Sequence, residues 1–580
     1  MTDLAELAKR RGFFFQSASA YGGVGGFYSY GPAGAALKQN VEDAWRDRFA
    51  VREGNIEIDA PTIMPEPVFE ASGHLDIFDD MLVECGECGG THRADHLVED
   101  NSDIEDAETY DPAEMVEVIA DLDLQCPTCG AALAGRPVEE FNLMFETGIG
   151  PGDGQPGYLR PETAQGIFVE FPRLKEYARG QLPFGVTQIG RAYRNEISPR
   201  NALVRTREFT QAELELFLRP DYEDPDLSSV ADVSLTLYPA ERQGEGDTEY
   251  LETTVADAVA DGVVENAWVA YYLGVAARWY DRIGIDMDRF RFRQHQAGER
   301  AHYANDCWDA EADVGDDEAE WIEMAGFADR GQYDLSKHGE YSDDDFTVFE
   351  EYDEPRTVER ATVDPDMSYL GPEFGGEAAA IAERLESLAR SDPEAFEGDV
   401  VTVTVDDETH EIPVEKTGFA VTEETESGEH VTPRVVEPSF GVDRAVFAVL
   451  THNDGTDEVE GEERRVLRLP PEIAPTTVAV FPLMDRDGMG DRADEVAQRL
   501  REAGLSVTYD DSGNIGRRYR RQDEVGTPFC VTVDYDTLED DTVTLRERDS
   551  TEQARVPIAD LADELAALAE GRRDFAALVE

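Results

Sequence analysis

Lysine is nearly missing from this sequence. Only five lysines occur among 580 residues, and arginine supplies the rest of the 51 basic side chains. Asp and Glu together number 127, so the formal net charge is −76. A surface this acidic and this poor in lysine is expected for a protein from a halophile, because a Debye length of roughly 3 Å in molar salt mutes self-repulsion. The net charge therefore indicates the solvent more than the partners.

Long hydrophobic runs are missing as well. No segment approaches 18 uninterrupted apolar residues, and the N-terminal MTDLAELAKRRGFFFQ has no apolar signal-peptide stretch. These absences predict a cytoplasmic protein with no membrane partner. Disorder is disfavoured, since 41% of the residues are hydrophobic and 9% are aromatic. At this length one core is not enough, and two to four domains are expected.

Cysteine is scarce, and most of it lies in two pairs, CGEC and CPTC. Each spacing lets both thiolates reach one metal ion, and two such knuckles predict a closed, structural Zn²⁺ site. The predicted ligands are Cys85, Cys88, Cys126 and Cys129. His92 and His96 leave other ligand sets open, as do unmetallated thiols, whereas disulfides are disfavoured in a reducing cytoplasm. Cys307 and Cys530 stand alone and are expected to be small buried residues.

The clearest domain boundary is the proline-rich segment RLPPEIAPTT at 468–477. Beyond it, 476–483, 505–511 and 529–535 read as strands, 491–503 as a helix, and Leu561, Leu565 and Leu568 mark a closing helix, which predicts a small α/β domain with a mostly parallel sheet. Upstream, 36–50 reads as an amphipathic helix, 184–196 and 206–218 as two strands, and 440–450 as a helix. The acidic segments 97–124, 221–260 and 330–430 are weakly patterned and are expected to be insertions that carry little chemistry.

Positive charge gathers in QIGRAYRNEISPRNALVRTREF, between the two predicted strands. A guanidinium group holds a carboxylate or a phosphate bidentately, although a solvated, salt-bridged hairpin is the simpler interpretation. An arginine and a glutamate two residues apart, followed by an aromatic residue on the next strand, outline a nucleotide clamp. Arg444 at the start of a helix also favours phosphate, and no Walker loop is present. The clustered arginines are Arg191, Arg194, Arg200, Arg205 and Arg207.

Several segments resemble a known family. AYRNE…TREF is similar to motif 2 of class II aminoacyl-tRNA synthetases, GVDRAVFAVL to their motif 3, and the helix 36–50 leading to Pro61 to motif 1, the dimerisation element. YLRPETAQGIFVEF and EPSFGVDR, together with ASGHLDIFDD, HRADHL and FNLMFET, resemble glycyl-tRNA synthetases of the homodimeric archaeal and eukaryotic kind. The resemblance covers most of 1–220 and 265–340, and 431–580.

The resemblance implies an α+β chain in which an antiparallel-sheet catalytic domain with insertions, one of them zinc-knuckle-like, precedes a small α/β anticodon-binding domain. The expected organisation is the catalytic core with motif 1 over 1–84, the zinc-knuckle-like insertion over 85–140, the core with motif 2 over 141–220, insertions and remaining core elements over 221–430, motif 3 over 431–470 and the anticodon-binding domain over 475–580.

The resemblance also implies roles for single residues. Arg194 would hold the α-phosphate and the amino-acid carboxylate, Glu196 the adenine amino group, and Phe209 would stack on the adenine ring. The residues implied for catalysis are Arg194, Glu196 and Arg444; for ATP with Mg²⁺, Arg194, Asn195, Glu196, Val204, Arg205, Phe209, Glu323, Met324, Gly441 and Arg444; and for glycine, Arg93, Glu162, Phe209, Glu213, Glu437, Ser439 and Gly441.

The implied activity is ATP-dependent attachment of glycine to tRNA(Gly) through glycyl-adenylate, by a homodimer that does not bind DNA. The C-terminal IGRRYRRQDEVGTPF, with Arg517, Arg518, Arg520 and Arg521 around Tyr519, suits RNA phosphates and stacked bases, or else forms a solvated helix face with acidic partners. Because RNA would be repelled by so acidic a protein in dilute buffer, tRNA binding is expected to be best at high salt. The alternatives are a class II synthetase for another small amino acid and a non-catalytic nucleic-acid-binding paralogue.

Overall fold

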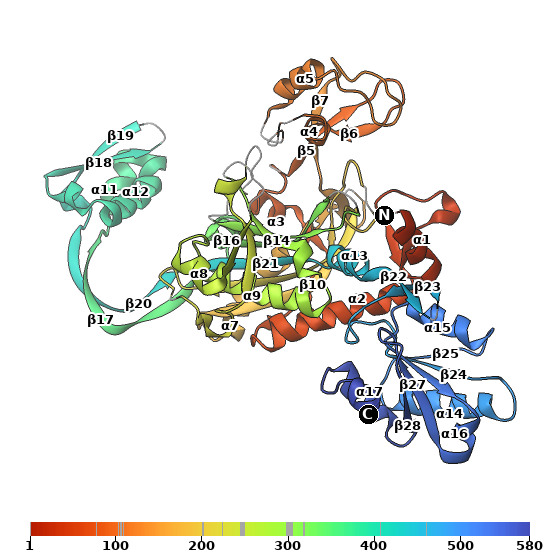
Figure 1. Ribbon diagram of the computed structural model, residues 1–580. Coiled ribbons are helices and arrows are strands. Elements are labelled where there is room, and N and C mark those ends of the chain that lie inside the picture. The colour runs from red at the N-terminus through yellow and green to blue at the C-terminus, as the bar shows by residue number, and fades with distance from the viewer. Residues whose placement is uncertain are drawn as a thin grey trace. The chain divides into compact units, whose positions relative to one another are not determined.

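The structure is a computed structural model in which two compact units separate, Met1–Phe346 with Thr432–Glu580 as the larger and Thr347–Val431 as the smaller (Figure 1). It describes residues 2–76, 78–102, 104, 107, 110–152, 154–199, 202–222, 224–243, 250–296, 306–316, 319–405, 408–459 and 461–579. Within these ranges no helix is both long enough and apolar enough to cross a bilayer.

A nine-stranded sheet forms the centre of the larger unit. Its order is β13-β12-β14-β15-β16-β21-β11-β10-β3, and all neighbours are antiparallel except the β10/β3 and β12/β14 pairs. The strands are β3 (Ile56–Glu57), β10 (Phe184–Tyr193), β11 (Glu208–Leu218), β12 (Ser234–Tyr238), β13 (Leu251–Thr254), β14 (Phe290–Gln294), β15 (Cys307–Asp313), β16 (Trp321–Gly331) and β21 (Arg434–Gly441). The expectation that 221–260 is a weakly patterned insertion is wrong, because Leu235 and Leu237 alternate into the core and make β12 part of this sheet.

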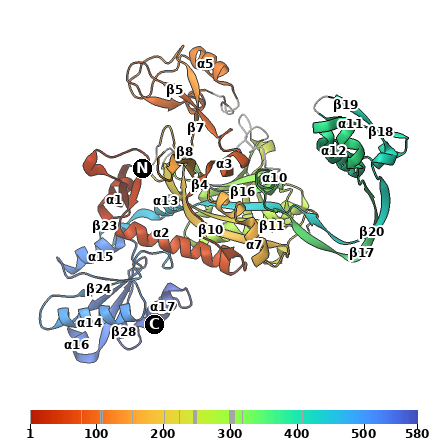
Figure 2. The ribbon, with the colours of Figure 1, turned by 180° about the vertical axis from the view of Figure 1, so that it is seen from behind.

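Three helices cover one face of the sheet, and α2 and α13 pack against each other (Figures 1 and 2). They are α2 (Pro32–Trp45), which continues as a wider helical turn over Arg46–Val51, α9 (Ala267–Arg282) and α13 (Val442–Asn453). Phe440, near the end of β21, is the centre of this packing. Its ring is surrounded at centroid distances of 4.8–6.0 Å by Trp45, Phe49, Trp279, Tyr280 and Phe327. These contacts fix the strand end that carries Ser439 and Gly441.

The opposite face of the sheet is partly polar. Along β11, Leu214 and Leu216 belong to the core under the three helices, so the alternation of a strand turns Glu213, Glu215 and Phe217 to the other side. The helices α6 (Ala164–Phe168), α7 (Phe171–Tyr177) and α10 (Tyr333–Tyr341) belong to this side, as does a small sheet of β4 (Ile63–Pro65), β8 (Phe145–Ile149) and β9 (Gln155–Leu159) with α3 (Glu66–Ala71). The remaining elements of the core are α1 (Thr2–Arg11), β1 (Phe14–Gln16), β2 (Tyr28–Tyr30) and α8 (Val255–Ala260).

The cysteine-containing segment forms a small body with its own core. A three-stranded sheet of β5 (Asp79–Glu84), β6 (Thr91–Arg93) and β7 (Val138–Asn142) packs with α4 (Ala94–Glu99) and α5 (Pro112–Asp121). The acidic stretch 97–124, expected to be weakly patterned, contains α5. That helix begins at a capping box of Asp111 and Glu114, with Met115 and Ile119 buried, so the stretch carries a local helix-start signal despite its acidity.

The C-terminal domain is a five-stranded sheet with the order β25-β24-β26-β27-β28. The strands β24 (Val478–Pro482), β25 (Val507–Tyr509) and β26 (Phe529–Val533) are parallel, as predicted, whereas β27 (Thr542–Glu547) and β28 (Gln553–Pro557) add an antiparallel hairpin that the sequence did not reveal. The helices are α14 (Met489–Glu502), α15 (Ile515–Asp523), α16 (Tyr535–Asp540), α17 (Leu561–Ala569), with Leu561, Leu565 and Leu568 buried as predicted, and α18 (Ala576–Val579).

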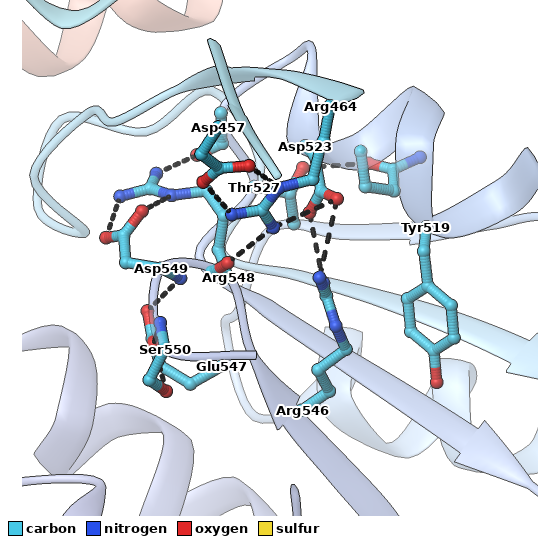
Figure 3. Close-up of polar contacts among 12 residues, drawn as sticks. Asp457, Arg464, Tyr519, Asp523, Thr527, Arg546, Glu547, Arg548, Asp549 and Ser550 are labelled. Atoms are coloured by element: carbon cyan, nitrogen blue, oxygen red, sulfur yellow. Dashed lines mark hydrogen bonds and ion pairs between the residues drawn. The ribbon is translucent and has the colours of Figure 1, made fainter. Parts of the chain in front are cut away.

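A buried ionic network joins this domain to the hairpin of β22 (Asp454–Val459) and β23 (Glu462–Leu467), which follows α13 directly (Figure 3). Asp523 at the end of α15 is 3.0 Å from Nη1 of Arg546 and 3.3 Å from Nη1 of Arg464. Arg464 also donates to Asp457 and to the backbone carbonyl of Arg548. Because every charge in the network has a partner, the burial of these groups is tolerated.

The smaller unit is a two-stranded ribbon of β17 (Val348–Thr362) and β20 (Ala420–Val431) with a compact end. The end consists of α11 (Met367–Phe374), α12 (Ala378–Ser391) and the hairpin of β18 (Val400–Val405) and β19 (Glu408–Pro413). Leu370, Ile381, Leu385, Phe396 and Ile412 form its core. Thr347–Val431 is thus a compact unit of its own, whereas 330–346, expected from the sequence to belong to the same insertion, are part of the larger unit.

Candidate active site

A pocket with about 540 Å³ of open space lies between the 194–207 loop, which joins β10 to β11, and the N-terminal end of α13. Of the residues proposed from the sequence, it brings together Arg194, Glu196, Val204, Arg205, Phe209, Glu323, Ser439, Gly441 and Arg444. Leu203, Thr206, Thr210, Gln211 and Asp443 complete the lining.

Arg194 is held at the pocket by aromatic rings. Its guanidinium carbon lies 5.4 Å from the ring centroid of Phe78 and 5.5 Å from that of Phe209, and its Nε donates to the carbonyl of Pro161 at 3.3 Å. Among the residues that the structure describes, no carboxylate lies within ion-pair distance of this guanidinium. Its charge is therefore available to an anionic ligand.

Arg444 and Glu323 form the second charged part of the pocket. Nη1 of Arg444 lies 3.1 Å from Glu323 Oε2, and this neighbour lowers the pKa of Glu323. Nε of Arg444 donates to the carbonyl of Val204 at 3.0 Å. Glu311 pairs with Glu323 across β15 and β16 and accepts from Arg291 at 2.6 Å. Two carboxylates at one place suit a hard cation such as Mg²⁺, and sequence reasoning missed Glu311 because it needs the strand register.

The start of α13, which presents Gly441 and Arg444, is fixed by Asp443. Its carboxylate accepts from the backbone N–H of Thr210 on β11 at 2.6 Å and from the hydroxyl of Tyr30. These bonds tie the N-terminal turn of α13 to β11. At Gly441 a Cβ would lie 3.4 Å from the carbonyl of Met324, which is an ordinary contact, so the backbone of β16 runs directly beside the start of α13.

The other clustered arginines have different environments. Nε of Arg205 lies 3.7 Å from Glu196 Oε2, and burial lowers the pKa of Arg205. Arg207 donates to the carbonyl of Glu196 at 3.0 and 2.7 Å and so shapes the loop, while Arg191 pairs with Glu208 at the surface. Arg200 lies outside the described residues. The cluster is thus divided between ligand-facing and structural roles.

Six of the residues predicted to bind ATP or glycine do not line the pocket, and three of them, Met324, Asn195 and Arg93, make contacts of other kinds. The side chain of Met324 packs in the hydrophobic core, and only its backbone lies beside Gly441. Asn195 donates its backbone N–H to the carbonyl of Leu143 at 2.8 Å. Arg93 is bound to Asp95 at 3.0 Å and to Asp80 at 3.2 Å. Burial raises the pKa of Asp80 to about 6 despite the Arg93 guanidinium.

The predicted glycine-binding carboxylates lie together below the pocket. Glu213 accepts from the hydroxyls of Ser439, at 2.6 Å, and Thr163. Ser439 also lines the pocket and so connects the two compartments. Glu162 accepts from the amide of Gln165 at 2.8 Å, and Glu437 accepts from a guanidinium N–H of Arg330. All three carboxylates are buried.

Burial and mutual repulsion divide the pKa values of these carboxyls. Burial raises the pKa of Glu437 to about 8, although Arg330 opposes the shift. Burial and the neighbouring Glu162 raise the pKa of Glu213. Burial also disfavours the charge of Glu162, but His74 and Arg330 outweigh it and its pKa is lowered. The site therefore has one carboxyl whose pKa lies below that of an ordinary glutamate and two that hold their protons more tightly.

Arg330, at the end of β16, was missed in the sequence because it fell in a segment read as an insertion. Its guanidinium binds Asp334 of α10 at 2.8 and 2.9 Å, contacts Glu437, lies 3.8 Å from Glu162 and faces the ring of Phe168. It is the cation that compensates the buried carboxylates. Regular strand alternation does not indicate this residue, because the register of β16 shifts between Asp329 and Gly331, where Arg330 lies.

The four predicted metal ligands meet in space. The Cys85 and Cys129 sulfurs are 3.6 Å apart, the Cys88 and Cys126 sulfurs 3.7 Å, and all four lie within 4.8 Å of one another. Tetrahedral Zn²⁺ with Zn–S bonds of 2.3 Å requires sulfurs about 3.8 Å apart, far beyond a disulfide. The four cysteines therefore fit zinc.

The backbone supports the same interpretation. The two cysteine pairs form turns of the same kind. The N–H of Gly89 donates to the carbonyl of Cys85, and the N–H of Gly130 donates to the carbonyl of Cys126. His92 Nε2 lies 3.3 Å from the Cys126 sulfur, so it stays an alternative ligand, whereas His96 lies beside Arg205.

The C-terminal arginine segment is mostly structural. Arg518 is buried and donates to the carbonyls of Pro482, Asp511 and Gly513. The hydroxyl of Tyr519 bonds Thr532 at 2.6 Å, and its ring faces the guanidinium of Arg546. The expectation that these two residues offer an RNA surface is wrong, because α15 turns them toward the domain core. Arg520 and Arg521 pair with Glu462 and Asp510, and Arg517 is exposed.

Known proteins share this architecture. Residues 477–568 match the family model described as an anticodon binding domain. A crystal structure of prolyl-tRNA synthetase from Cryptosporidium parvum, complexed with L-proline and AMP, aligns over 98% of this chain and 75% of that one, with a TM-score of 0.50 and 12% identity. At such low identity the likeness concerns the fold alone. The fold is that of the class II aminoacyl-tRNA synthetases.

Sequence relatives are more specific. The glycine–tRNA ligase of Methanothrix thermoacetophila is 48% identical over 554 residues, covering 95% of this chain and 94% of the relative. That of Archaeoglobus fulgidus is 46% identical over 578 residues, covering 99% and 98%. The chain belongs to the glycine–tRNA ligase family.

Proposed function

We propose that the pocket joins glycine to ATP and passes the glycyl group to the 3′ end of tRNA(Gly). One observation carries this proposal: Arg194, Arg205 and Arg444 line an open pocket, and Ser439 connects it to the buried carboxylates around Glu213. The triphosphate of ATP is negative and the ammonium group of glycine is positive. Binding both therefore needs arginines in one compartment and carboxylates in the other. Family membership supports the choice of glycine.

In the first step, a carboxylate oxygen of glycine attacks the α-phosphorus of ATP, the bond to the β-phosphate bridge oxygen breaks, and pyrophosphate leaves. The guanidinium groups would stabilise the charge that develops on the phosphorus oxygens, so no side-chain nucleophile is needed. Mg²⁺ bound with ATP supplies further charge neutralisation, and Glu323 and Glu311 would hold it. In the second step, a ribose hydroxyl of tRNA attacks the acyl carbon and AMP leaves.

Amino-acid choice would rest on the carboxylates Glu162, Glu213 and Glu437 with the Ser439 hydroxyl. An ammonium group among them relieves their repulsion, which favours an occupied pocket. Larger amino acids would need space that this buried cluster does not offer, although one extra methyl in a rigid pocket costs only about 1–3 kcal/mol.

Pyrophosphate exchange into ATP, run with Mg²⁺ in molar KCl for each amino acid separately, tests this function. We expect exchange with glycine alone. Exchange with another amino acid would leave the phosphate-binding residues in place and overturn the glycine pocket. No exchange with any amino acid, from folded protein at several salt concentrations, would favour a non-catalytic nucleic-acid-binding paralogue.

We also propose that the four cysteines hold one structural Zn²⁺, on the strength of their spacing. We expect about one equivalent of zinc per chain in protein purified without added metal, measured by plasma mass spectrometry. Cys88→Ser should lose most of it, because a structural site needs all four ligands. Cys530→Ala is the matched control, since this cysteine is buried in the C-terminal domain, and it should keep the metal. Equal zinc in both variants would contradict the proposal.

We further propose that the protein is a homodimer from a halophilic source and that its site residues have the roles implied by the family resemblance. The net charge of −76 with five lysines supports the halophilic source, and the similarity of 36–50 and Pro61 to motif 1 supports the dimer.

A further inference from the structure

Glu215 is a buried carboxyl group that the reaction described above does not use. It lies on β11 two residues beyond Glu213, with none of its surface exposed. Both of its carboxylate oxygens are inaccessible and have no hydrogen-bond partner within the described part of the chain. On the same strand face, Phe217 packs against Phe171 and Phe184. Glu215 therefore stands between the glycine carboxylates and an apolar cluster.

The strand register places this residue opposite Glu437. The pairing of β11 with β21 runs without a shift from Glu213–Ser439 to Leu216–Val436, so Glu215 faces Glu437 on the side of the sheet that carries the site. Directly opposed side chains of a strand pair are about 5 Å apart, and like charges there repel. Two buried carboxyls at that distance cannot both be ionised, as in the carboxyl pairs of aspartic proteases.

The surroundings supply too little positive charge for both. The permanent cation here is Arg330, and its guanidinium is shared among Asp334, Glu437 and Glu162. Burial lowers the pKa of His74, and that of His338 to about 4, so neither adds charge at neutral pH. The titratable and charged groups that face the pair are Glu213 on β11, Arg330 on β16, Cys307 on β15, Asp334 and His338 on α10, Glu162 before α6, and His74 after α3.

The acidities of the two groups agree with this geometry. Burial, followed by the charge of Glu437, raises the pKa of Glu215 well above the ordinary value of a glutamate. Burial raises that of Glu437 to about 8. With an empty pocket at pH 7, the pair therefore holds its protons.

We propose that Glu215 is a positioning residue for glycine: it stays a neutral acid, and its O–H, which has no partner among the described residues of the empty site, turns to Glu437 once that group ionises, so that binding of the glycine ammonium expels one proton from the pair. The proton leaves the Glu437 carboxyl for solvent, the ammonium takes its place, and Glu215 keeps its own proton. This inference rests on the proposed function, because it requires glycine in the pocket.

The sign of the pH dependence follows. Below about pH 8, glycine must displace a proton to bind, so the KM for glycine should fall as the pH rises from 6 toward 8. Calorimetric titration of the wild-type chain with glycine at pH 7, repeated in buffers of different ionisation enthalpy, should report release of close to one proton. Release of none would overturn the proposal.

Glu215→Gln tests the residue itself through the pH profile of glycine-dependent exchange. An amide is a weaker donor to a carboxylate than a neutral acid is, so the rise in KM toward acid pH should begin at higher pH. A displacement of roughly 0.5–1 pH unit corresponds to a KM about 3- to 10-fold higher at pH 7, and the two proteins should converge well above pH 8.

Two other results for Glu215→Gln would contradict the proposal, and they can be told apart. If Glu215 were ionised, its removal would relieve repulsion on Glu437 and move the profile to lower pH. A KM raised equally at every pH would indicate a purely structural role, and either result overturns the proposal. Glu208→Gln, at the exposed start of the same strand, is the matched control and should leave the profile unchanged. If Glu215→Gln shows glycine-dependent exchange with the same pH profile as the wild type, only this inference is wrong. If the wild type shows no glycine-dependent exchange at any pH, the proposed function is wrong.

Discussion

Replacing Arg194 by alanine should lower glycine-dependent pyrophosphate exchange by about 10²–10³-fold or more. One preorganised donor that meets charge developing in a transition state contributes about this much. Its guanidinium is poised for a ligand, because within the described chain it contacts two aromatic rings and a backbone carbonyl and forms no ion pair with a carboxylate. The quantity to measure is kcat/KM for ATP at saturating glycine.

Two comparisons make that result specific. Arg191→Ala removes a guanidinium from the same strand that pairs with Glu208 at the surface, and should leave exchange within about twofold. Thermal unfolding of Arg194→Ala should match the wild type, since the substitution breaks no ion pair of the described chain. Exchange retained within tenfold would remove Arg194 from the phosphate-binding role.

Arg330→Met should destabilise the folded chain by about 3–5 kcal/mol. The change leaves the buried carboxyl groups of Asp334, Glu437 and Glu162 without their shared cation, and any of them that is ionised then becomes an uncompensated buried charge, which costs about this much. Urea unfolding followed by the fluorescence of the buried tryptophans of the catalytic core measures it. Glycine-dependent exchange should fall as well, because Arg330 positions Glu437.

The loss should depend on pH in a defined direction. Neutral carboxyls need no cation, so the destabilisation should be smaller at pH 5 than at pH 8, where the Glu437 carboxyl begins to ionise at its pKa of about 8. Arg46→Met, which breaks partly exposed pairs with Asp43 and Glu57 on the surface, is the control and should cost about 0–1 kcal/mol. A destabilisation by Arg330→Met that is the same at both pH values would mean that lost packing, and not charge, is the cause.

Prediction from sequence succeeded where neighbouring residues carry the information. The helix start at Gly441 to Arg444, the strand pair around the 194–207 loop and the two cysteine turns are each local, and the structure has them where the motifs indicated. Patterning failed where short elements join a distant partner. Strand β12 and the hairpin of β27 and β28 are stable only because long-range strand pairing completes them.

The C-terminal arginines also show that a sequence pattern does not reveal tertiary arrangement. Composition favoured an RNA-binding surface, but a helix displays only part of its circumference, and α15 buries Arg518 while leaving Arg517 exposed. Which arginine is free depends on how the helix is rotated against its sheet, and spacing along the chain does not reveal that rotation.

The sequence by itself determined the family and the chemical types at the site, because recognition of phosphate and ammonium needs arginines and glutamates within short, contiguous motifs. Only the tertiary structure decided how their charges balance. Glu215, Arg330 and Glu437 lie far apart along the chain and meet through the register of β11, β21 and β16. Their protonation depends on distance and burial, which are properties of the packed sheet and of no single segment.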